Sequence, residues 1–427
     1  MTSPAPPHVA PASAAARGKV FSWTLFDFAN TAFSVVVVTV IYSRYFTNHV
    51  AGGQRWLWGL AVSLSMISAA ALSPPLGAVA DFARSRKRFL LAFTLVAVCC
   101  TALLMFVQEG LIVTGLVLFV LANIGFEGGL VFYDAFLPGI TNRSSYGRVS
   151  GYGFAMGYLG ALAILLLVMV VLPDSSDPAY LGGVRFTFVM AAAFFLVFSL
   201  PLFLFVPEPP SAAIRPPSLL RAGFQTAVGT FRALFIERRH PSVARFLLAF
   251  FIYNDGILTV IAFAAIFAET TLGMDDTAII AFFALVQTSA VAGSLLFGVL
   301  TDKIGPKRTI TITLLMWIGI TVAAYFIASV AWFYGVAFAA GTAIGSSQSA
   351  SRSLMALLTP PGHEAEYFGF YDGLCGKASA VVGPLVYGIL ADLTDERLAT
   401  LAIALFFLVG LILLQGVTEP ERRPLRA

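Results

Sequence analysis

Charged residues are scarce in this sequence. Asp, Glu, Lys and Arg together make up 11% of its 427 residues, whereas about a quarter of the residues of a typical soluble domain are charged. Hydrophobic residues account for 59%. A chain of this length with so little charge cannot cover the surface of a soluble globule. We therefore expect an all-α membrane protein that crosses the bilayer many times.

The sequence also lacks the residue clusters that enzymes and metalloproteins need. Its three cysteines, Cys99, Cys100 and Cys375, lie in apolar runs and have neither metal-site nor disulfide spacing. No HExxH or GxSxG pattern occurs, and the four histidines do not cluster. We therefore expect no enzymatic activity, no metal and no cofactor. The formal charge of +4 is only weak evidence for a nucleic-acid partner, and we expect none.

Long apolar runs predict about twelve membrane-spanning helices of roughly 20 residues or more. The first six cover 21–45, 57–80, 89–108, 111–137, 149–172 and 184–206, and the second six cover 245–268, 277–300, 309–329, 331–358, 367–391 and 397–417. Residues 1–18 are rich in Pro, Ala and Ser and are expected to be disordered. Because no convincing small-residue cleavage site follows the first apolar run, we interpret that run as a retained span.

The basic residues predict how the chain is oriented. With the N-terminus inside, 20 of the 26 Lys and Arg residues fall in inner segments, 4 fall in outer loops, and Arg352 and Lys377 lie within spans. Inner loops of membrane proteins are enriched in Lys and Arg. We therefore expect a multi-pass protein with both termini in the cytoplasm. The ratio of 5 Lys to 21 Arg is typical of a GC-rich bacterial genome and favours the cell membrane over a vacuole.

A repeated motif divides the chain into two similar halves. In each copy a Gly stands four residues before an Asp, and a cationic pair follows: Gly77, Asp81 and Arg86-Lys87, then Gly298, Asp302 and Lys307-Arg308. The two aspartates are 221 residues apart, about half of the chain, and such repeats are typical of secondary transporters. The expected parts are a tail (1–18), a six-helix bundle (19–206), a cytoplasmic linker with one amphipathic helix over 218–236 (207–244), a second bundle (245–418) and a C-terminal tail (419–427).

Two homologous six-span halves with this motif resemble the major facilitator superfamily. Three further segments look like its branch that contains the fungal vacuolar amino-acid effluxers of autophagy and their bacterial relatives: Trp23-Thr24-Leu25-Phe26-Asp27-Phe28-Ala29-Asn30, Phe132-Tyr133-Asp134-Ala135-Phe136-Leu137-Pro138 and Gln348-Ser349-Ala350-Ser351-Arg352-Ser353. The resemblance implies a major facilitator fold, in which twelve transmembrane helices form two pseudo-symmetric six-helix bundles. It also implies secondary transport, but it does not transfer a substrate.

Charged groups inside the spans are the candidate functional groups, because they are costly in hydrocarbon and usually face a cavity or the bundle interior. We interpret Asp27, Glu127 and Asp255 as the proton-coupling set, since a buried carboxylate can take up a proton during transport. Asp255 is the strongest candidate, because Gly256 beside it indicates a loosened helix. Asp27 could instead cap a helix near the interface. Glu127 could belong to a structural ion pair, and Asp255 could form a hydrogen bond that fixes helix packing.

Other polar residues in the spans are candidates for substrate binding. Arg352 could hold a substrate carboxylate through two parallel hydrogen bonds, or it could pair with Asp372 or Glu127. Asp372 and Lys377 are five residues apart, which does not place both squarely on one α-helical face, so Lys377 is expected to reach a different partner. The predicted substrate-binding set is Asn30, Tyr133, Tyr253, Asn254, Gln348, Arg352 and Tyr371.

The repeated motif is a candidate gate. Asp81 and Asp302 are predicted to bridge helix ends of opposite halves, for instance at a positive helix N-terminus, and to release when the protein opens inward. Asp134 is expected to pair with a cation of 84–88. The alternative is that these charges only determine topology. The predicted gate set is Asp81, Arg86, Lys87, Asp134, Asp302, Lys307, Arg308, Asp372 and Lys377.

Together these residues favour alternating access by a secondary transporter. A small polar solute, an amino acid or a related metabolite, would bind in mid-membrane and be driven by a proton gradient. The alternative is a facilitator or exporter of another small metabolite or drug-like compound without proton coupling. A passive channel or a membrane sensor is less favoured. The expected partners are the small-molecule substrate, protons and membrane lipids, and the chain is expected to be a monomer.

Overall fold

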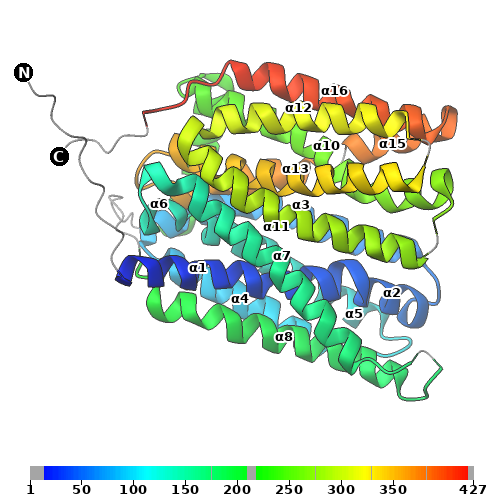
Figure 1. The fold of residues 1–427 in the computed structure, drawn as a ribbon. Helices are drawn as coiled ribbons and strands as arrows, with labels where there is room; N and C mark the ends of the chain where they lie inside the picture. Colours follow the sequence, from blue (N-terminus) through cyan, green and yellow to red (C-terminus); the bar gives the residue numbers. More distant parts are fainter. Residues whose placement is uncertain are drawn as a thin grey trace, which may run out of the picture.

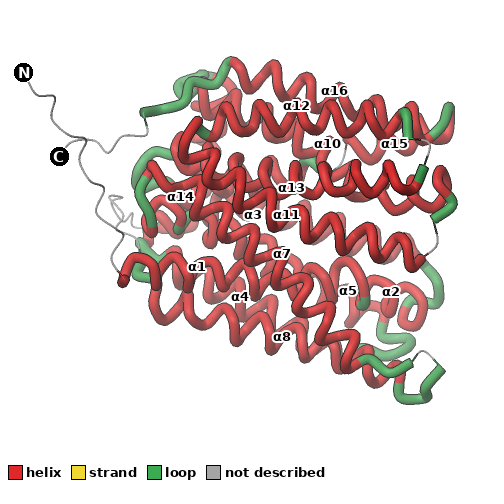
Figure 2. The backbone as a smooth tube through the Cα atoms, in the orientation of Figure 1, coloured by secondary structure: helices red, strands yellow, loops and turns green. Residues whose placement is uncertain are grey.

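The apolar runs fold into helices because a backbone surrounded by hydrocarbon must form its hydrogen bonds within its own segment. A computed structural model of the chain describes residues 14–174, 176–208, 218–274, 276–327, 329–380 and 382–421. Within these ranges every regular element is helical, and the long helices lie side by side in one bundle (Figure 1, Figure 2). The expected all-α membrane fold is thereby confirmed.

The first half of the chain contains six helical spans, of which the first is interrupted by π-helical turns. The elements, in chain order, are α1 (Ala14–Phe33), η1 (Ser34–Val40), α2 (Tyr42–Tyr45), η2 (Phe46–Val50), α3 (Arg55–Ala83), α4 (Arg86–Leu103), η3 (Leu104–Phe106), α5 (Ile112–Asp134), α6 (Leu137–Ile140), η4 (Arg143–Ser145), α7 (Tyr146–Val171) and α8 (Tyr180–Phe205).

The second half begins after a linker helix and contains five long spans and one broken span. The elements are α9 (Leu219–Phe231) and η5 (Arg232–Ile236) of the linker, then α10 (Pro241–Leu272), α11 (Asp276–Ile304), α12 (Pro306–Tyr325), α13 (Val330–Leu358), α14 (Glu364–Phe368), η6 (Gly369–Gly376), α15 (Val382–Leu393) and α16 (Glu396–Gln415). The linker helix expected over 218–236 corresponds to α9 and η5.

The span expected as one helix over 367–391 is divided into α14, the π-helix η6 and α15. A second helix therefore starts inside the membrane-spanning region at Val382. Pro384 lies in the first turn of α15, where a missing N–H leaves no hydrogen bond unmade. Such discontinuous helices are tolerated in a membrane when other protein groups satisfy the exposed backbone.

Helices of the two halves meet at the end of the bundle where α1 begins and α16 ends (Figure 1). We call this the basic end, because it carries the cationic loops 84–88 and 303–308. Here α7 packs against α11 and α13, while α3 packs against α14 and η6. Glycines let the backbones touch: a Cβ on Gly77 would lie 2.3 Å from the Ala365 carbonyl oxygen, and one on Gly151 would lie 2.3 Å from that of Ser294.

Candidate functional site

Arg352 is the centre of a charge cluster that joins the two halves. It belongs to α13 and is almost fully buried. Its Nη1 donates to Asp134 Oδ1 at 2.8 Å and lies 3.4 Å from Asp27 Oδ2. Its Nε donates to Ser150 Oγ at 2.9 Å, and its Nη2 donates to the Ser150 carbonyl oxygen at 2.8 Å. A cation of the second half is thus held by two carboxylates and a serine of the first half.

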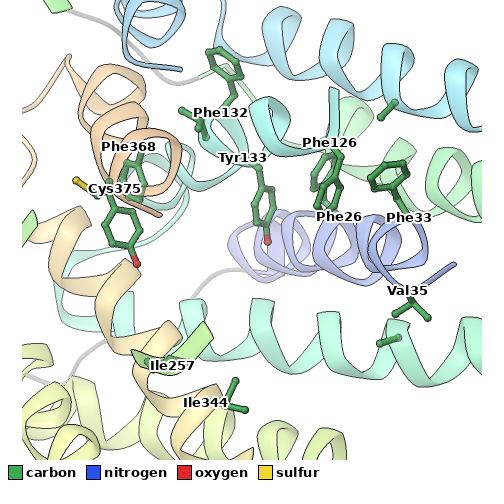
Figure 3. Packing of buried hydrophobic residues seen from close by; sticks show 14 of the residues in the cluster. Phe26, Phe33, Val35, Phe126, Phe132, Tyr133, Ile257, Ile344, Phe368 and Cys375 are labelled. Carbon is green, nitrogen blue, oxygen red and sulfur yellow. The ribbon is translucent and has the colours of Figure 1, made fainter. Parts of the chain in front are cut away.

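Aromatic rings enclose this cluster. The guanidinium carbon of Arg352 lies 4.1 Å from the ring centroid of Phe154 and 4.9 Å from that of Trp23. Tyr133 stacks on Trp23 with centroids 4.6 Å apart, and its hydroxyl donates to Asp27 Oδ2 at 2.7 Å. Figure 3 shows the Tyr133 side chain reaching toward α1. A desolvated cation–π contact contributes about 2 kcal/mol, so the rings help to keep the charged side chain in the interior.

The prediction that Asp134 pairs with a cation of the 84–88 loop is wrong. Asp134 is the last residue of α5, and its buried carboxylate faces Arg352. Arg86 of the loop instead binds Asp81, with Nε 2.7 Å from Oδ1. Sequence reasoning considered only the nearest cationic loop, whereas the actual partner comes from the other half of the chain.

A second charge cluster surrounds Lys377. Its Nζ forms a buried ion pair with Glu127 of α5 and lies 3.2 Å from Asp372 Oδ2. Glu127 and Asp372 are thus partners of Lys377 and not of Arg352. Lys377 reaches a different partner, Glu127, as expected, but it also binds Asp372, which α-helical spacing does not place on the same face. Residues 369–376 form a π-helix, whose hydrogen bonds run from residue i to i+5, so residues five apart come to the same face.

Each cluster contains one cation and two carboxylates. With all groups ionised, one positive and two negative charges leave a formal net charge of −1 in each cluster. An unbalanced charge is costly in a low-dielectric interior. Each cluster can therefore stabilise one proton or one cationic group of a solute. The members are Arg352 with Asp27 and Asp134, and Lys377 with Glu127 and Asp372.

Two of the predicted neutral ligands lie beside Arg352. The hydroxyl of Tyr253 lies 2.6 Å from Ser351 Oγ, and Gln348 Oε1 accepts from the hydroxyl of Tyr158 at 2.5 Å. Gln348, Ser351 and Arg352 follow the i, i+3, i+4 spacing of one face of α13. The second of these hydrogen bonds joins α7 to α13 and therefore crosses between the halves.

The other predicted neutral ligands are also buried. Asn254 Nδ2 donates to Ser379 Oγ at 2.6 Å, next to the break before α15. Tyr371 packs against Phe250, with ring centroids 4.3 Å apart. Asn30 lies on α1, three residues after the Asp27 of the Arg352 cluster, and is 3% exposed. Their burial leaves the predicted role in substrate binding a prediction.

Asp255 holds the start of the second half-helix. This residue of α10 is 1% exposed, and its two carboxylate oxygens accept from the backbone N–H of Gly383 at 2.8 and 2.9 Å. A carboxylate at a helix N-terminus is stabilised by the positive end of the helix dipole. This contact corresponds to the packing alternative that the sequence left open for Asp255.

The first latch is formed by Asp81 at the basic end. Its carboxylate accepts from the backbone N–H groups of Ala365 at 3.2 Å and Glu366 at 3.0 Å, at the start of α14. Arg86 binds both Asp81 and Glu364, so it also reaches across to the other half. The first latch therefore consists of a helix N-terminus, a carboxylate and a shared arginine.

The second latch repeats this arrangement with the halves exchanged. Asp302 of α11 accepts from the backbone N–H of Gly147 at 2.9 Å and of Arg148 at 3.3 Å, at the start of α7. The side chain of Arg148 adds an ion pair at 3.2 Å, but it is half exposed and solvent screens it. Each half thus inserts one aspartate at a helix N-terminus of the other.

His363 lies beside the first latch. Its Nδ1 is 3.1 Å from Glu366 Oε2. The hydrogen bond to Glu366 raises the pKa of His363 above its ordinary value, and the nearby carboxylates of Asp81 and Glu364 act in the same direction. The protonated imidazole is therefore favoured next to these acidic groups.

The lysines of the two motifs occupy positions that differ from the predicted gate. Lys87 Nζ donates to the Val206 carbonyl oxygen at 2.6 Å, at the end of α8. Lys307 Nζ donates to the carbonyl oxygens of Gln415 and Val417 at 2.8 Å, at the end of α16. These contacts fasten the last span of each half to its own bundle, while Arg308 is exposed. These contacts of Lys87 and Lys307 therefore support a role within each half.

Several partners escaped the sequence analysis. Glu208 and Glu419 accept from the backbone N–H of Lys87 and of Lys307 in matching positions. Each of these glutamates follows the last span of its half and precedes a proline, so the repeat carried a signal that could have identified them. Ser150 carried no comparable signal, because a small hydroxyl in an apolar span rarely has a charged partner.

Comparison with known proteins identifies relatives along most of the chain. The profile of the family described as "Vacuole effluxer Atg22 like" matches residues 58–423. YxiO of Bacillus subtilis (strain 168), an uncharacterized MFS-type transporter, is 30% identical over 421 residues, which cover 93% of this chain and 94% of that protein. Autophagy-related protein 22 of Pichia angusta is 25% identical over 406 residues, covering 82% and 72% of the two chains.

Solved structures of the major facilitator superfamily share the fold. The proton:xylose symporter XylE aligns with a TM-score of 0.76 at 16% identity, covering 97% of this chain and 98% of XylE. The human organic anion transporter MFSD10 aligns with a TM-score of 0.76 at 16% identity, covering 94% and 99%. The structural alignments and the family profile therefore indicate the same superfamily. The chain is a multi-pass membrane transporter of the major facilitator superfamily and belongs to the family of Atg22-like vacuole effluxers.

Proposed function

We propose that this protein is a secondary active transporter that moves a small polar solute by alternating access. The observation that carries the proposal is the Arg352 cluster, in which a cation of one half meets Asp27 and Asp134 of the other. Ion pairs between the halves can be replaced by a solute that brings its own carboxylate or amine. Solute binding is then linked to movement of the two halves.

The basic end faces the cytoplasm and is closed in this state. The excess of Lys and Arg on that side supports this orientation. The contacts of Asp81 and Asp302 with the opposite halves support closure, since both latches must break before the halves can separate there. The solute then enters from the other side, and the membrane is the cell membrane.

Transport is coupled to protons. Each charge cluster has one carboxylate more than it has cations, so uptake of one proton neutralises it without any backbone movement. Glu127 is the clearest proton acceptor, because its side chain is 9% exposed against 21% for Asp372, so that an unbalanced charge costs more at Glu127. Asp27 is the second, because its distance of 3.4 Å from Arg352 is longer than the 2.8 Å of Asp134.

The solute is an amino acid or a related metabolite that carries a carboxylate. Arg352 offers the planar fork of N–H groups that binds a carboxylate through two parallel hydrogen bonds. A solute that takes this place releases Asp27 and Asp134, and either carboxylate can then accept the ammonium group of an amino acid. The cluster therefore has the charges that a zwitterion requires.

Transport by the purified protein in lipid vesicles tests the carrier. A thermal-shift screen first selects candidate solutes. It tests amino acids, peptides, sugars and nucleosides for those that raise the melting temperature of the protein. Saturable counterflow of a selected labelled solute is the expected result, whereas a linear flux that does not saturate contradicts alternating access.

Two conservative variants test the coupling. We expect Glu127→Gln and Asp27→Asn to retain counterflow and to lose accumulation driven by a pH gradient. If both variants accumulate solute as the wild type does, proton coupling through these carboxylates is wrong. A wild type that shows counterflow but no accumulation driven by a pH gradient would instead be a facilitator that moves solute without protons.

A further inference from the structure

The linker helix α9 has an apolar face that remains exposed. Leu220, Phe224 and Phe231 stand at positions i, i+4 and i+11, which share one side of a helix. Their exposed fractions are 71%, 61% and 44%. Gly223 and Ala227, which lie on the directly adjoining side of the helix, are buried. The helix is therefore held by the protein along one side and presents large apolar side chains along another.

The buried side of α9 rests on α3 near the basic end. A Cβ on Gly223 would lie 2.3 Å from Val79 Cγ2 and 2.8 Å from the Pro75 carbonyl oxygen. α3 ends at Ala83, so this contact lies roughly 6–12 Å inside the end of a membrane span, at about 1.5 Å per residue. Amphipathic helices at a membrane surface bury their apolar side by about 5–10 Å. The exposed face of α9 thus lies at the depth where head groups meet acyl chains.

A polar row runs beside the apolar face. Arg221, Gln225 and Arg232 each follow one of the three apolar residues, so this row is rotated from the apolar face by about 100°. Arg232 pairs with Glu237, which also binds Arg239. Glu237 is the only acidic residue in 219–239, a segment with four arginines, and the segment has a net charge of +3. The cations are exposed.

We propose that α9 and η5 form a surface anchor that binds anionic phospholipids of the leaflet at the basic end. The apolar face inserts among the upper acyl chains, and the neighbouring arginines contact lipid phosphates. Two observations favour an anionic phospholipid as the ligand: the depth at which α9 contacts α3, and the adjacent rows of apolar and cationic side chains. An acidic protein would satisfy the arginines but not the apolar face at this depth. The proposal does not depend on which solute is transported.

The first experiment compares two neighbouring positions of the full chain in nanodiscs. Phe224→Cys and Gln225→Cys are made separately in a background in which Cys99, Cys100 and Cys375 are replaced by Ala. A membrane-impermeant maleimide is expected to label the Phe224→Cys variant about tenfold more slowly than the Gln225→Cys variant in nanodiscs that contain phosphatidylglycerol. Equal labelling rates at the two positions would overturn insertion of the apolar face.

The second experiment tests the lipid charge. Phosphatidylglycerol retained by the purified protein is measured by native mass spectrometry for Arg221→Gln/Arg232→Gln and for the control Arg44→Gln/Arg55→Gln, which removes two exposed arginines at the opposite end. The linker variant should retain the lipid about 30-fold less well, given about 1 kcal/mol for each of the two arginines near an anionic surface. Equal losses in both variants, or equal retention of phosphatidylcholine and phosphatidylglycerol by the wild type, overturn the proposal.

Discussion

Replacing Gly77 by Ala should open the basic end of the molecule. Gly77 lies where α3 crosses the start of α14. A Cβ there would lie 2.3 Å from the Ala365 carbonyl oxygen, 2.6 Å from its carbonyl carbon and 2.9 Å from the Glu366 Cα. All three are backbone atoms, so no side-chain rotation can relieve the overlap. The two helices must move apart, and they belong to different halves.

The size of the effect follows from this overlap. Ordinary contact begins at 3.4 Å, so α3 and α14 must separate by about 1 Å at this point. The same movement lengthens the hydrogen bonds of 3.2 and 3.0 Å that hold Asp81 to α14. Overpacking of this kind costs about 1–3 kcal/mol. Because only the closed state has the overlap, the ratio of closed to open molecules should fall roughly 5-fold to 150-fold.

Distances between spin labels can measure this change. Labels at Arg88→Cys and Arg308→Cys, two exposed positions on opposite halves at the basic end, should show a longer distance in Gly77→Ala. Gly59→Ala is the matched control, because it lies on the same helix with nothing within 4 Å of its Cβ. Both variants gain about 1 kcal/mol of helix propensity, so their difference isolates the overlap. Unchanged distances in Gly77→Ala, or equal opening in both variants, would refute the reasoning.

Substitutions centred on three further residues, Arg352, Asp255 and His363, test the buried charges and the first latch. Arg352→Gln leaves two carboxylates without their cation and should destabilise the protein by roughly 3–5 kcal/mol. Adding Asp134→Asn removes one of these carboxylates and should recover part of the loss. A wild-type melting temperature in Arg352→Gln would contradict the ion pairs. Asp255→Asn keeps an acceptor oxygen at the start of α15 and should retain transport. Asp255→Ala removes that acceptor and should lower the free energy of unfolding by about 1 kcal/mol. Loss of transport in a stable Asp255→Asn variant would instead make Asp255 a proton site. The pKa of His363 is raised by Glu366, so its stabilising contribution is complete below about pH 6.5 and is lost as the pH rises through the raised value. The melting temperature of the wild type should therefore fall with rising pH by more than that of His363→Gln, and identical pH dependence in the two proteins would contradict the contact.

The spans were predictable because the bilayer imposes a simple rule on the sequence. A segment of about 20 apolar residues must be helical, and this requirement depends on local composition alone. The positions expected for Asp81 and Asp302 were predictable for a related reason. An aspartate between two spans, followed by cations, has few favourable positions other than a nearby helix N-terminus. The sequence could not reveal which N-terminus, since α7 and α14 belong to distant parts of the chain.

The break before α15 and the π-helix η6 were not predictable from hydrophobicity. The residues 367–391 read as one apolar run, and α-helical spacing separates Asp372 from Lys377. In the folded chain, Asp255 of α10 satisfies the new helix start at Gly383, so the break costs little. The π-helix η6 then places Asp372 and Lys377, which are five residues apart, on one face, where both contact the same cluster. Both features depend on partners that approach only after the helices have packed.

By itself, the sequence determined that the chain is helical, that it crosses a membrane, that its two halves are related, and most of the charged residues that are buried. These properties follow from composition, local hydrophobic runs and an internal repeat. Only the tertiary structure decided that Arg352 is shared by Asp27 and Asp134, that Glu127 and Asp372 share Lys377, and that Lys87 and Lys307 fasten their own halves. The physical reason is that a buried charge needs a partner within a few ångströms, and helix packing rather than sequence separation determines which group that is.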